Sequence, residues 1–208
     1  CRAVIIIDEV QAIPAKCIHL FNLAMNFLTH ICGSTVVLCS ATQPCLEQAE
    51  YPILLDEQES MTADFQADFD AFRRTVLHSA GKKSFSYEDA ADFCTEQYQK
   101  NGNLLLVVNT KQAALTMFQK LKERNSEFAT VLHLSTNMCP AHRRTVIQQM
   151  QEQLAAHQPL ICVTTQLIEA GVDISFRCVV RSMSGLDHAA QAAGRCIEMG
   201  SMIAAPFI

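Results

Sequence analysis

Short apolar runs and amphipathic segments alternate through the second half of the chain, and this alternation constrains the fold more than any other feature. Each β-branched run of strand length is followed by a segment whose apolar residues recur at helical spacing. Such alternation predicts right-handed strand–helix–strand units and a parallel sheet. The expected strands are 73–78, 103–108, 129–134, 160–164 and 177–183, and the expected helices are 87–100, 111–124 and 140–156.

The first part of the chain has the same pattern on a smaller scale. Five apolar residues at 3–7 predict a central strand covered on both faces, residues 14–29 predict a helix, and residues 35–39 predict a second strand. We therefore expect an α/β protein with an incomplete first domain and a nearly complete second one. The expected boundaries are 1–55 for the first domain, 56–72 for an acidic linker, 73–196 for the second domain and 197–208 for an atypical tail.

Composition and charge narrow the class of protein. Half of the 208 residues are apolar and 18% are charged, as is ordinary for a globular protein. Residues 1–72 hold two basic and ten acidic side chains, whereas residues 73–208 hold fourteen and eleven. Ten cysteines occur singly, which favours buried thiols in a reducing compartment over disulfides or zinc sites. We expect a cytoplasmic location and no membrane partner, and the opening in mid-strand predicts that the chain is part of a longer protein.

Polar residues follow the two expected strands of the first domain. Asp8 and Glu9 come directly after the first strand, where two adjacent carboxylates are costly without a partner. Mg²⁺ is the obvious partner, since an aspartate at such a strand end helps to hold it in nucleotide hydrolases while a neighbouring carboxylate orients water. Ser40 and Thr42 follow the second strand and could relay the state of a nucleotide site to nucleic acid. Helix capping and a simple turn are the respective alternatives.

Polar residues also follow the strands of the second domain. Loops at the carboxyl ends of parallel strands bind ligands in open α/β sheets, so we expect these residues to converge on one crevice. The glycine at 171 permits a tight turn, and the guanidinium of Arg195 can donate two hydrogen bonds to a phosphate. The candidates for this crevice are Thr165, Gln166, Gly171, Asp173, Gln191, Gly194 and Arg195. The candidates to track a sugar-phosphate backbone are Asn109, Thr110, Ser135, Thr136, Thr164 and Thr165, and turn chemistry is the alternative for each.

Five blocks of sequence, in order, resemble the helicase motor of the CRISPR-associated helicase-nuclease of type I interference systems. They are IIDEVQ at 6–11, SATQP at 40–44, HLST at 133–136 with MCPAHR at 138–143, TQLIEAGVDISF at 165–176, and GLD at 185–187 with QAAGRC at 191–196. The resemblance implies two RecA-like parallel-sheet lobes, the cofactors ATP and Mg²⁺, and movement on single-stranded DNA toward a nuclease. It implies a CRISPR RNA-guided surveillance complex as a partner.

The same resemblance implies a role for each motif residue. Asp8 would hold magnesium and Glu9 would activate water, while Ser40 and Thr42 would couple the lobes. Gln11, Gly171 and Asp173 would lie on the nucleotide side, and Gln191 and Arg195 would face the phosphates. The acidic pair of the first lobe and Arg195 of the second are then expected to face each other across a gap.

Three departures from the family pattern bear on activity. The chain contains no G-x-x-x-x-G-K-[ST] phosphate loop, Glu198 stands where the family carries a second arginine, and the tail at 197–208 stops resembling the family. An HD nuclease pattern is absent from the sequence as well. We therefore expect an ATP-dependent helicase as the parent protein and negligible ATP hydrolysis by this chain alone. The alternatives are another superfamily 2 helicase acting in repair or on RNA, a non-catalytic nucleic-acid-binding module, and a piece that cannot fold stably.

Overall fold

The computed structural model describes residues 2–40, 45–55, 61, 64, 67, 70–71, 75–81, 84–165, 174–184 and 192–205. The chain divides into two compact units, Cys1–Phe72 and Arg73–Ile208, which are described separately below. In the part of the chain that is described, every helix is too short or too polar to cross a membrane.

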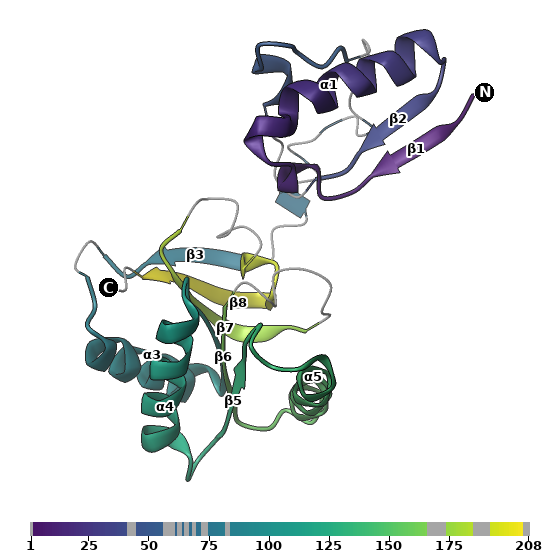
Figure 1. Ribbon diagram of the computed structural model, residues 1–208. Coiled ribbons are helices and arrows are strands. Elements are labelled where there is room, and N and C mark those ends of the chain that lie inside the picture. Colours follow the sequence, from purple (N-terminus) through teal and green to yellow (C-terminus); the bar gives the residue numbers. More distant parts are fainter. Residues whose placement is uncertain are drawn as a thin grey trace. The chain divides into compact units, whose positions relative to one another are not determined.

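The first unit is a two-stranded parallel sheet with one helix packed on it. Strands β1 (Val4–Ile7) and β2 (Thr35–Leu38) pair in parallel, with Ile7 opposite Leu38. The connection between them forms η1 (Val10–Ala12), η2 (Ala15–Cys17), α1 (Ile18–Asn26) and a π-helical turn, η3 (Phe27–Ile31), and η4 (Leu46–Gln48) follows β2. Figure 1 shows α1 lying along the sheet. The predicted strand–helix–strand order is confirmed.

One face of this small sheet is exposed, contrary to the prediction that β1 is covered on both faces. Val4 and Ile6 are 71% and 69% exposed. Ile7 packs with α1 in the core of the unit, and alternation along a strand turns Val4 and Ile6 to the opposite face. Because α1 covers one face only, an apolar strand that reads as fully buried is half exposed.

The second unit is a six-stranded, fully parallel sheet. The strand order is β3-β8-β7-β4-β6-β5, which places β4 between β7 and β6. The strands are β3 (Thr75–Ser79), β4 (Asn103–Val107), β5 (Thr130–Leu134), β6 (Leu160–Thr164), β7 (Phe176–Ser182) and β8 (Cys196–Ala205). The helices are α3 (Tyr87–Asn101), α4 (Lys111–Asn125) and α5 (Pro140–Ala155). The predicted α/β fold with parallel sheets is confirmed, because every predicted strand and helix of this unit is present.

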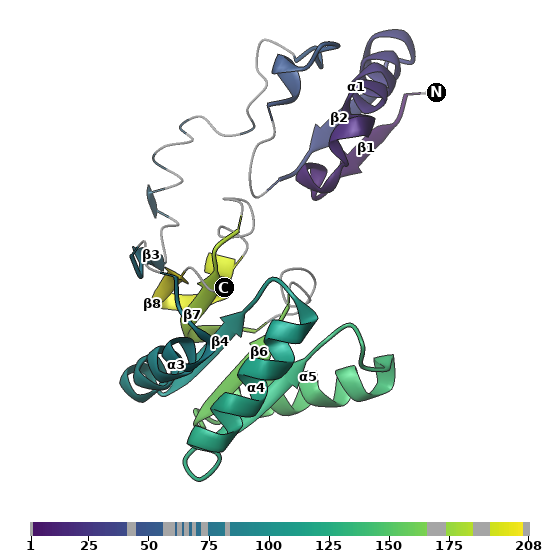
Figure 2. The same ribbon diagram turned by 60° about the vertical axis from the view of Figure 1, so that its left-hand side comes forward.

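Helices cover the two faces of this sheet unequally. Helices α3 and α4 lie side by side on one face and α5 lies on the other, as Figures 1 and 2 show. Leu104 and Leu106 of β4 pack in the core beneath α3 and α4, whereas Leu105 and Val107 pack in the core beneath α5. A strand buried on both faces needs apolar residues at successive positions, which explains the unbroken apolar runs in the sequence.

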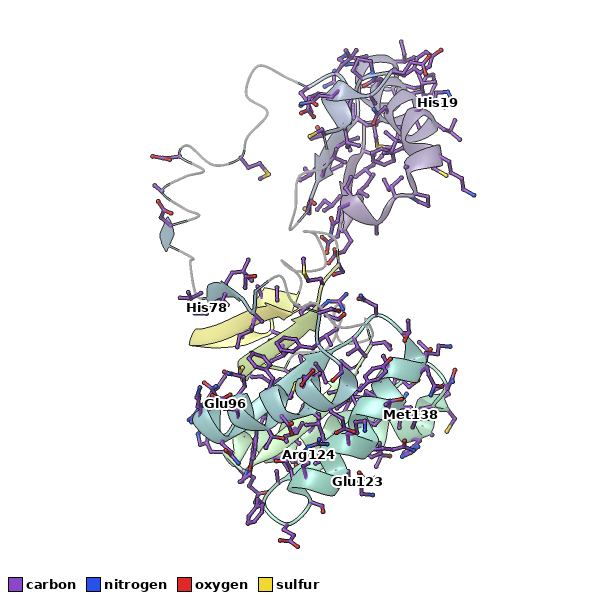
Figure 3. All side chains as sticks on the ribbon, turned by 90° about the vertical axis from the view of Figure 1, so that its left-hand side faces the viewer. His19, His78, Glu96, Glu123, Arg124 and Met138 are labelled. Carbon is purple, nitrogen blue, oxygen red and sulfur yellow. The ribbon has the colours of Figure 1, made fainter. Side chains whose placement is uncertain are left out.

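Helix ends and ion pairs fix α3 and α4. Ser86 and Asp89 form a capping box at the start of α3, and Gly102 ends it in the left-handed conformation. Glu88 pairs with Lys120 and Arg124 of α4, and Arg124 Nε also lies 3.0 Å from Asp92 Oδ1. Figure 3 labels Arg124 on the surface of the unit. Hydrogen bonds from Lys120 and Arg124 lower the pKa of Glu88, and the same carboxylate raises the pKa of Arg124.

Residues 197–205 of the segment that the sequence predicts as an atypical tail lie in a strand. Residues 196–205 form β8, which pairs with β7 on one side and with β3 on the other. Val180 lies opposite Ile203, and Ile203 belongs to the core beneath α3 and α4. Cys196 and Ile203 are buried, as suits a strand with a neighbour on each side.

Candidate functional site

The acidic pair of the first unit lies at the carboxyl end of β1 and is exposed to solvent. The Glu9 backbone N–H donates to Asp8 Oδ1 over 2.8 Å. Glu9 adopts the left-handed conformation with φ of 56°, which is uncommon for a residue other than glycine. Its side chain makes no capping hydrogen bond to η1, so the capping alternative finds no support. The turn at Glu9 instead leaves both carboxylates at the strand end.

A hydrogen-bonded chain joins this acidic pair to the end of β2. Ser40 Oγ donates to Gln11 Oε1 over 2.6 Å, and Gln11 Nε2 donates to Glu9 Oε2. The backbone reinforces the link, since Val10 N–H donates to the Cys39 carbonyl over 3.2 Å. The structure therefore brings Asp8, Glu9, Gln11 and Ser40 together at neighbouring strand ends. We call these four residues the acidic tip.

The donor set of the acidic tip fits a magnesium ion. Asp8 Oδ2 accepts no hydrogen bond from any residue that the structure describes, while Oδ1 is held by the Glu9 amide. Mg²⁺ in phosphate-binding sites takes one or two carboxylates and completes its octahedron with water and phosphate oxygens. Among the described residues, no group of three or more His, Cys, Asp or Glu side chains forms a preformed metal cage. Asp8 thus suits an ion shared with a phosphate ligand.

The second unit presents its polar residues along one edge of the sheet. The carboxyl ends of β7, β4, β6 and β5 lie next to one another in that order, because these strands are parallel neighbours. We define the polar edge as residues 109–111, 135–137, 164–165 and 182–184. Lys111 is its charged residue, and these positions include no Asp or Glu. Helices α4 and α5 both begin at this edge, and Arg143 and Arg144 lie at the fourth and fifth positions of α5.

Side-chain hydrogen bonds connect the strand ends of the polar edge. Asn109 Nδ2 donates to Met183 O over 2.8 Å and to Ser182 Oγ over 3.2 Å, which joins β4 to β7. Lys111 Nζ donates to Asn137 Oδ1 over 2.9 Å, which joins the start of α4 to the loop after β5. The polar edge is therefore an ordered row of groups.

Several predicted contacts have structural roles at this edge. Thr110 Oγ1 accepts from the Ala113 N–H as the cap of α4, and Ser135 Oγ accepts from the Asn137 N–H. Ser135 is 4% exposed and Thr164 is 0% exposed. The prediction that Thr164 presents its hydroxyl on an open rim does not hold, because the last position of β6 is buried within the sheet. Thr136 is exposed and Thr165 is half-buried at the edge.

Arg195 lies at the opposite edge of the sheet from these residues. Its carbonyl accepts from the Phe176 N–H over 2.8 Å, and Phe176 begins β7 while Arg195 directly precedes β8. The prediction that Arg195 and Thr165 converge on one crevice at the carboxyl ends is therefore wrong. Strands β7 and β8 are parallel, so the connection from β7 to β8 must lead from the carboxyl end of the sheet back to its amino end. Gly194 is exposed beside it.

Five candidates lie outside the described residues. They are Thr42, Gln166, Gly171, Asp173 and Gln191, whose roles stay predictions. The expected approach of Asp8 to Arg195 also stays a prediction, since these residues belong to different units.

The structure adds three residues that sequence reasoning missed. Lys111 and Asn137 bridge two strand ends, and Arg181 is buried in β7 with Nη1 2.9 Å from Asn109 Oδ1. The sequence could have indicated Lys111, because this lysine directly follows the predicted polar residues at 109–110. Its signal for Arg181 is weaker and consists of one arginine inside an apolar run.

Comparisons with known proteins bear on this arrangement. A family model described as "CRISPR-associated nuclease/helicase Cas3, C-terminal" matches residues 100–198. The CRISPR-associated nuclease/helicase Cas3 of Haloferax volcanii is 39% identical over 66 residues, which make up 32% of this chain and 7% of that protein. These 66 residues are a small part of the relative, so the match does not show that this chain has the activity of the whole relative.

Solved structures share the fold across both units. The chain resembles T. fusca Cas3 with AMPPNP at a TM-score of 0.71 and 15% identity, covering 98% of this chain and 29% of that one. It resembles a chain of a CRISPR RNA-guided surveillance complex in a pre-nicking state at a TM-score of 0.69 and 13% identity, covering 97% and 31%. The helicase Lhr of Mycobacterium smegmatis, bound to ssDNA and AMP-PNP, matches at a TM-score of 0.60 and 15% identity, covering 98% and 28%.

These findings confirm the resemblance drawn from the motifs. The two parallel sheets match the RecA-like lobes of Cas3 structures, and the helicase Lhr shares this fold. The chain spans about 29% of the solved T. fusca Cas3 and 7% of its curated relative. Residues 100–198 thus match the family model of the Cas3 C-terminal region, and both units have the fold of the corresponding part of the solved Cas3 structures.

Proposed function

We propose that the polar edge of the second unit binds the phosphate backbone of single-stranded DNA as part of an ATP-dependent DNA helicase in CRISPR antiviral defence. The observation that carries this proposal is the row of four strand ends, whose described positions include Lys111 and no Asp or Glu. Phosphate contacts of this kind come from lysine and arginine side chains, hydroxyls, amides and helix N-termini, and they fix a strand without reading its sequence.

Helix ends strengthen this electrostatic argument. Cys139 precedes α5 and makes no side-chain capping bond, so backbone N–H groups of the first turn can face an anion. Arg143 ends that turn and Arg144 follows it, and Arg143 Nη2 donates to the Met138 carbonyl over 3.3 Å. The N-termini of α4 and α5 and the side chains of Lys111, Arg143 and Arg144 therefore lie at the same end of the sheet.

The acidic tip of the first unit supports a nucleotide role for the parent protein. Asp8 would hold Mg²⁺, which neutralises phosphate charge when bound, and Glu9 would orient water through the carboxylate that Gln11 holds. Ser40 contacts Gln11, so a change at the nucleotide side would reach the end of β2 through one hydrogen bond. Arg195 would supply the guanidinium that faces the phosphates, and the solved T. fusca Cas3 structures with ADP and ATP support nucleotide binding in the family.

The parent protein would act with a surveillance complex, as the structural neighbour in the pre-nicking complex supports. The chain itself lacks the phosphate loop in its sequence. We propose that it binds DNA in the absence of nucleotide and hydrolyses ATP negligibly.

Fluorescence anisotropy with a labelled oligo-dT tests the DNA-binding role. Lys111→Gln removes one positive charge from the polar edge, whereas Lys122→Gln makes the same change on the same helix beside Phe128 and Thr130, near the amino end of β5. We expect Lys111→Gln to weaken binding about threefold and to reduce the salt-dependence slope by roughly 0.7, the value for one phosphate on a single strand. Lys122→Gln is expected to leave both quantities unchanged.

Two results would contradict the proposal. The wild-type chain would fail to bind oligo-dT at low salt, or the two lysine variants would lose affinity equally. Measuring phosphate release in the same samples tests the second statement, since turnover that disappears on Asp8→Ala would show that the chain alone is an ATPase.

A further inference from the structure

A buried arginine lies directly beneath the polar edge. Arg181 of β7 is 1% exposed, and its register partner on β4 is Val107. Its Nη1 donates to Val107 O over 3.4 Å and to Asn109 Oδ1 over 2.9 Å. Burial of a guanidinium is unfavourable unless acceptors surround it, and its net contribution to stability is often small. A geometric role explains its place better than stability does.

This guanidinium selects one of the two orientations of the Asn109 amide. An arginine side chain has donors and no acceptor, whereas an asparagine amide has an acceptor end and a donor end. Arg181 therefore requires Oδ1 to face it, which turns Nδ2 toward Met183 O and Ser182 Oγ. In the rotated amide, Oδ1 would face the Met183 carbonyl, and two acceptors would meet. The arginine thus decides which contacts Asn109 makes.

Asn109 stands between two segments that matter for binding. The next residue, Thr110, caps α4, and Lys111 follows at the polar edge. On the other side, Met183 is the first residue after β7, in the segment that leads toward Arg195. We propose that Arg181 is a positioning residue, which acts through Asn109 to hold the start of α4 and the exit of β7 in one fixed arrangement for nucleic-acid binding. This inference rests on the function proposed above.

A double-mutant cycle on the full chain tests the inference. Arg181→Met keeps a long side chain and removes every donor, and Asn109→Ala removes the amide. We expect each single variant to weaken oligo-dT binding roughly threefold to tenfold, the range for one lost hydrogen bond. The double variant is expected to have the same affinity for oligo-dT as the single variant that binds less tightly, because both changes break the same connection. Arg181→Lys keeps a donor and is expected to recover part of the affinity.

Hydrogen exchange supplies a readout that is independent of DNA. We expect both single variants to accelerate amide exchange in residues 108–111 and 182–184 and to leave α5 unchanged. Cys162→Ala is the matched control, since Cys162 is fully buried in the neighbouring strand β6 and makes none of these contacts. It is expected to lower the unfolding temperature without changing affinity.

Additive effects in the double variant, or unchanged exchange at 182–184 in Asn109→Ala, would overturn the positioning role. An equal loss of affinity in Cys162→Ala would show that loss of stability alone explains the result. If the wild-type chain does not bind oligo-dT, the proposed function fails, and exchange at 182–184 still decides whether Arg181 positions this corner.

Discussion

Replacing Thr164 with valine is expected to stabilise the second unit without weakening its binding to single-stranded DNA. Thr164 is fully buried at the end of β6, and its Oγ1 has no hydrogen-bond partner among the residues that the structure describes. A buried hydroxyl in this situation costs about 1–3 kcal/mol. Valine has the same shape and no polar atom, so the substitution removes that cost and keeps the packing.

We expect a gain in the free energy of unfolding at the lower end of this range, because rotation of the hydroxyl relieves part of the cost of burying it. An increase of about 1 kcal/mol in the free energy of unfolding raises the Tm of a domain of this size by about 4 °C. Thermal unfolding followed by circular dichroism measures it directly. Thr165→Val is the matched control, since this neighbouring residue is half-buried, and we expect its effect to stay within about 0.5 kcal/mol.

Oligo-dT affinity gives the second half of this test. Burial keeps the Thr164 hydroxyl away from a bound strand, so we expect the affinity of Thr164→Val to equal that of the wild type. A lower Tm would mean that the hydroxyl has a partner. A clear loss of DNA affinity at unchanged stability would restore Thr164 as a direct contact, and the burial argument would be refuted.

Three further predictions concern the second unit. His157 ends α5 with φ of 53°, so His157→Gly is expected to stabilise by about 0.5–1 kcal/mol in urea unfolding, whereas His157→Ala, which keeps the strained Cβ, is not. The ion pairs of Glu88 lower its pKa, so their contribution to stability is present above the ordinary carboxylate pKa and is lost as the pH falls through the lowered pKa. We therefore expect Glu88→Gln to lower the Tm at neutral pH and low salt. A Tm difference between this variant and the wild type that persists at acid pH or in high salt would contradict the argument. Burial raises the pKa of the Cys162 thiol to about 12, so a thiol reagent is expected to modify exposed Cys139 at once and Cys162 only after unfolding, as mass spectrometry can check.

Strands and helices of the second unit could be predicted from sequence because their signals are local. Residues 160–164 form β6 as expected, since an apolar β-branched run between polar segments suits a strand covered on both faces. Helix α4 begins at Lys111 after the Thr110 cap, again within a few residues of its signal. Sheet order is not local, so nothing in residues 196–205 alone indicates that β8 lies between β3 and β7.

The acidic tip could be predicted in part. Two consecutive strands joined by one helix are expected to be parallel neighbours, which brings Asp8 and Glu9 near Ser40. The bridge through Gln11 depends on the left-handed turn at Glu9, which the sequence does not signal because glutamate disfavours that conformation. Backbone strain of this kind is found at functional sites, where the surrounding structure holds it in place.

Strand alternation fails in β7, and the failure explains why Arg181 escaped notice. Arg177 and Arg181 are four residues apart, so simple alternation puts both on one face and treats them alike. An irregularity in register between Phe176 and Cys178 shifts the phase, and Phe176 packs with Val179 beneath α5 while Cys178 packs beneath α3 and α4. Arg177 is exposed near the start of β7, whereas Arg181 is buried near its end, against β4, where Asn109 accepts its hydrogen bond. Strand alternation alone therefore does not distinguish the arginine that meets solvent from the one beneath the polar edge.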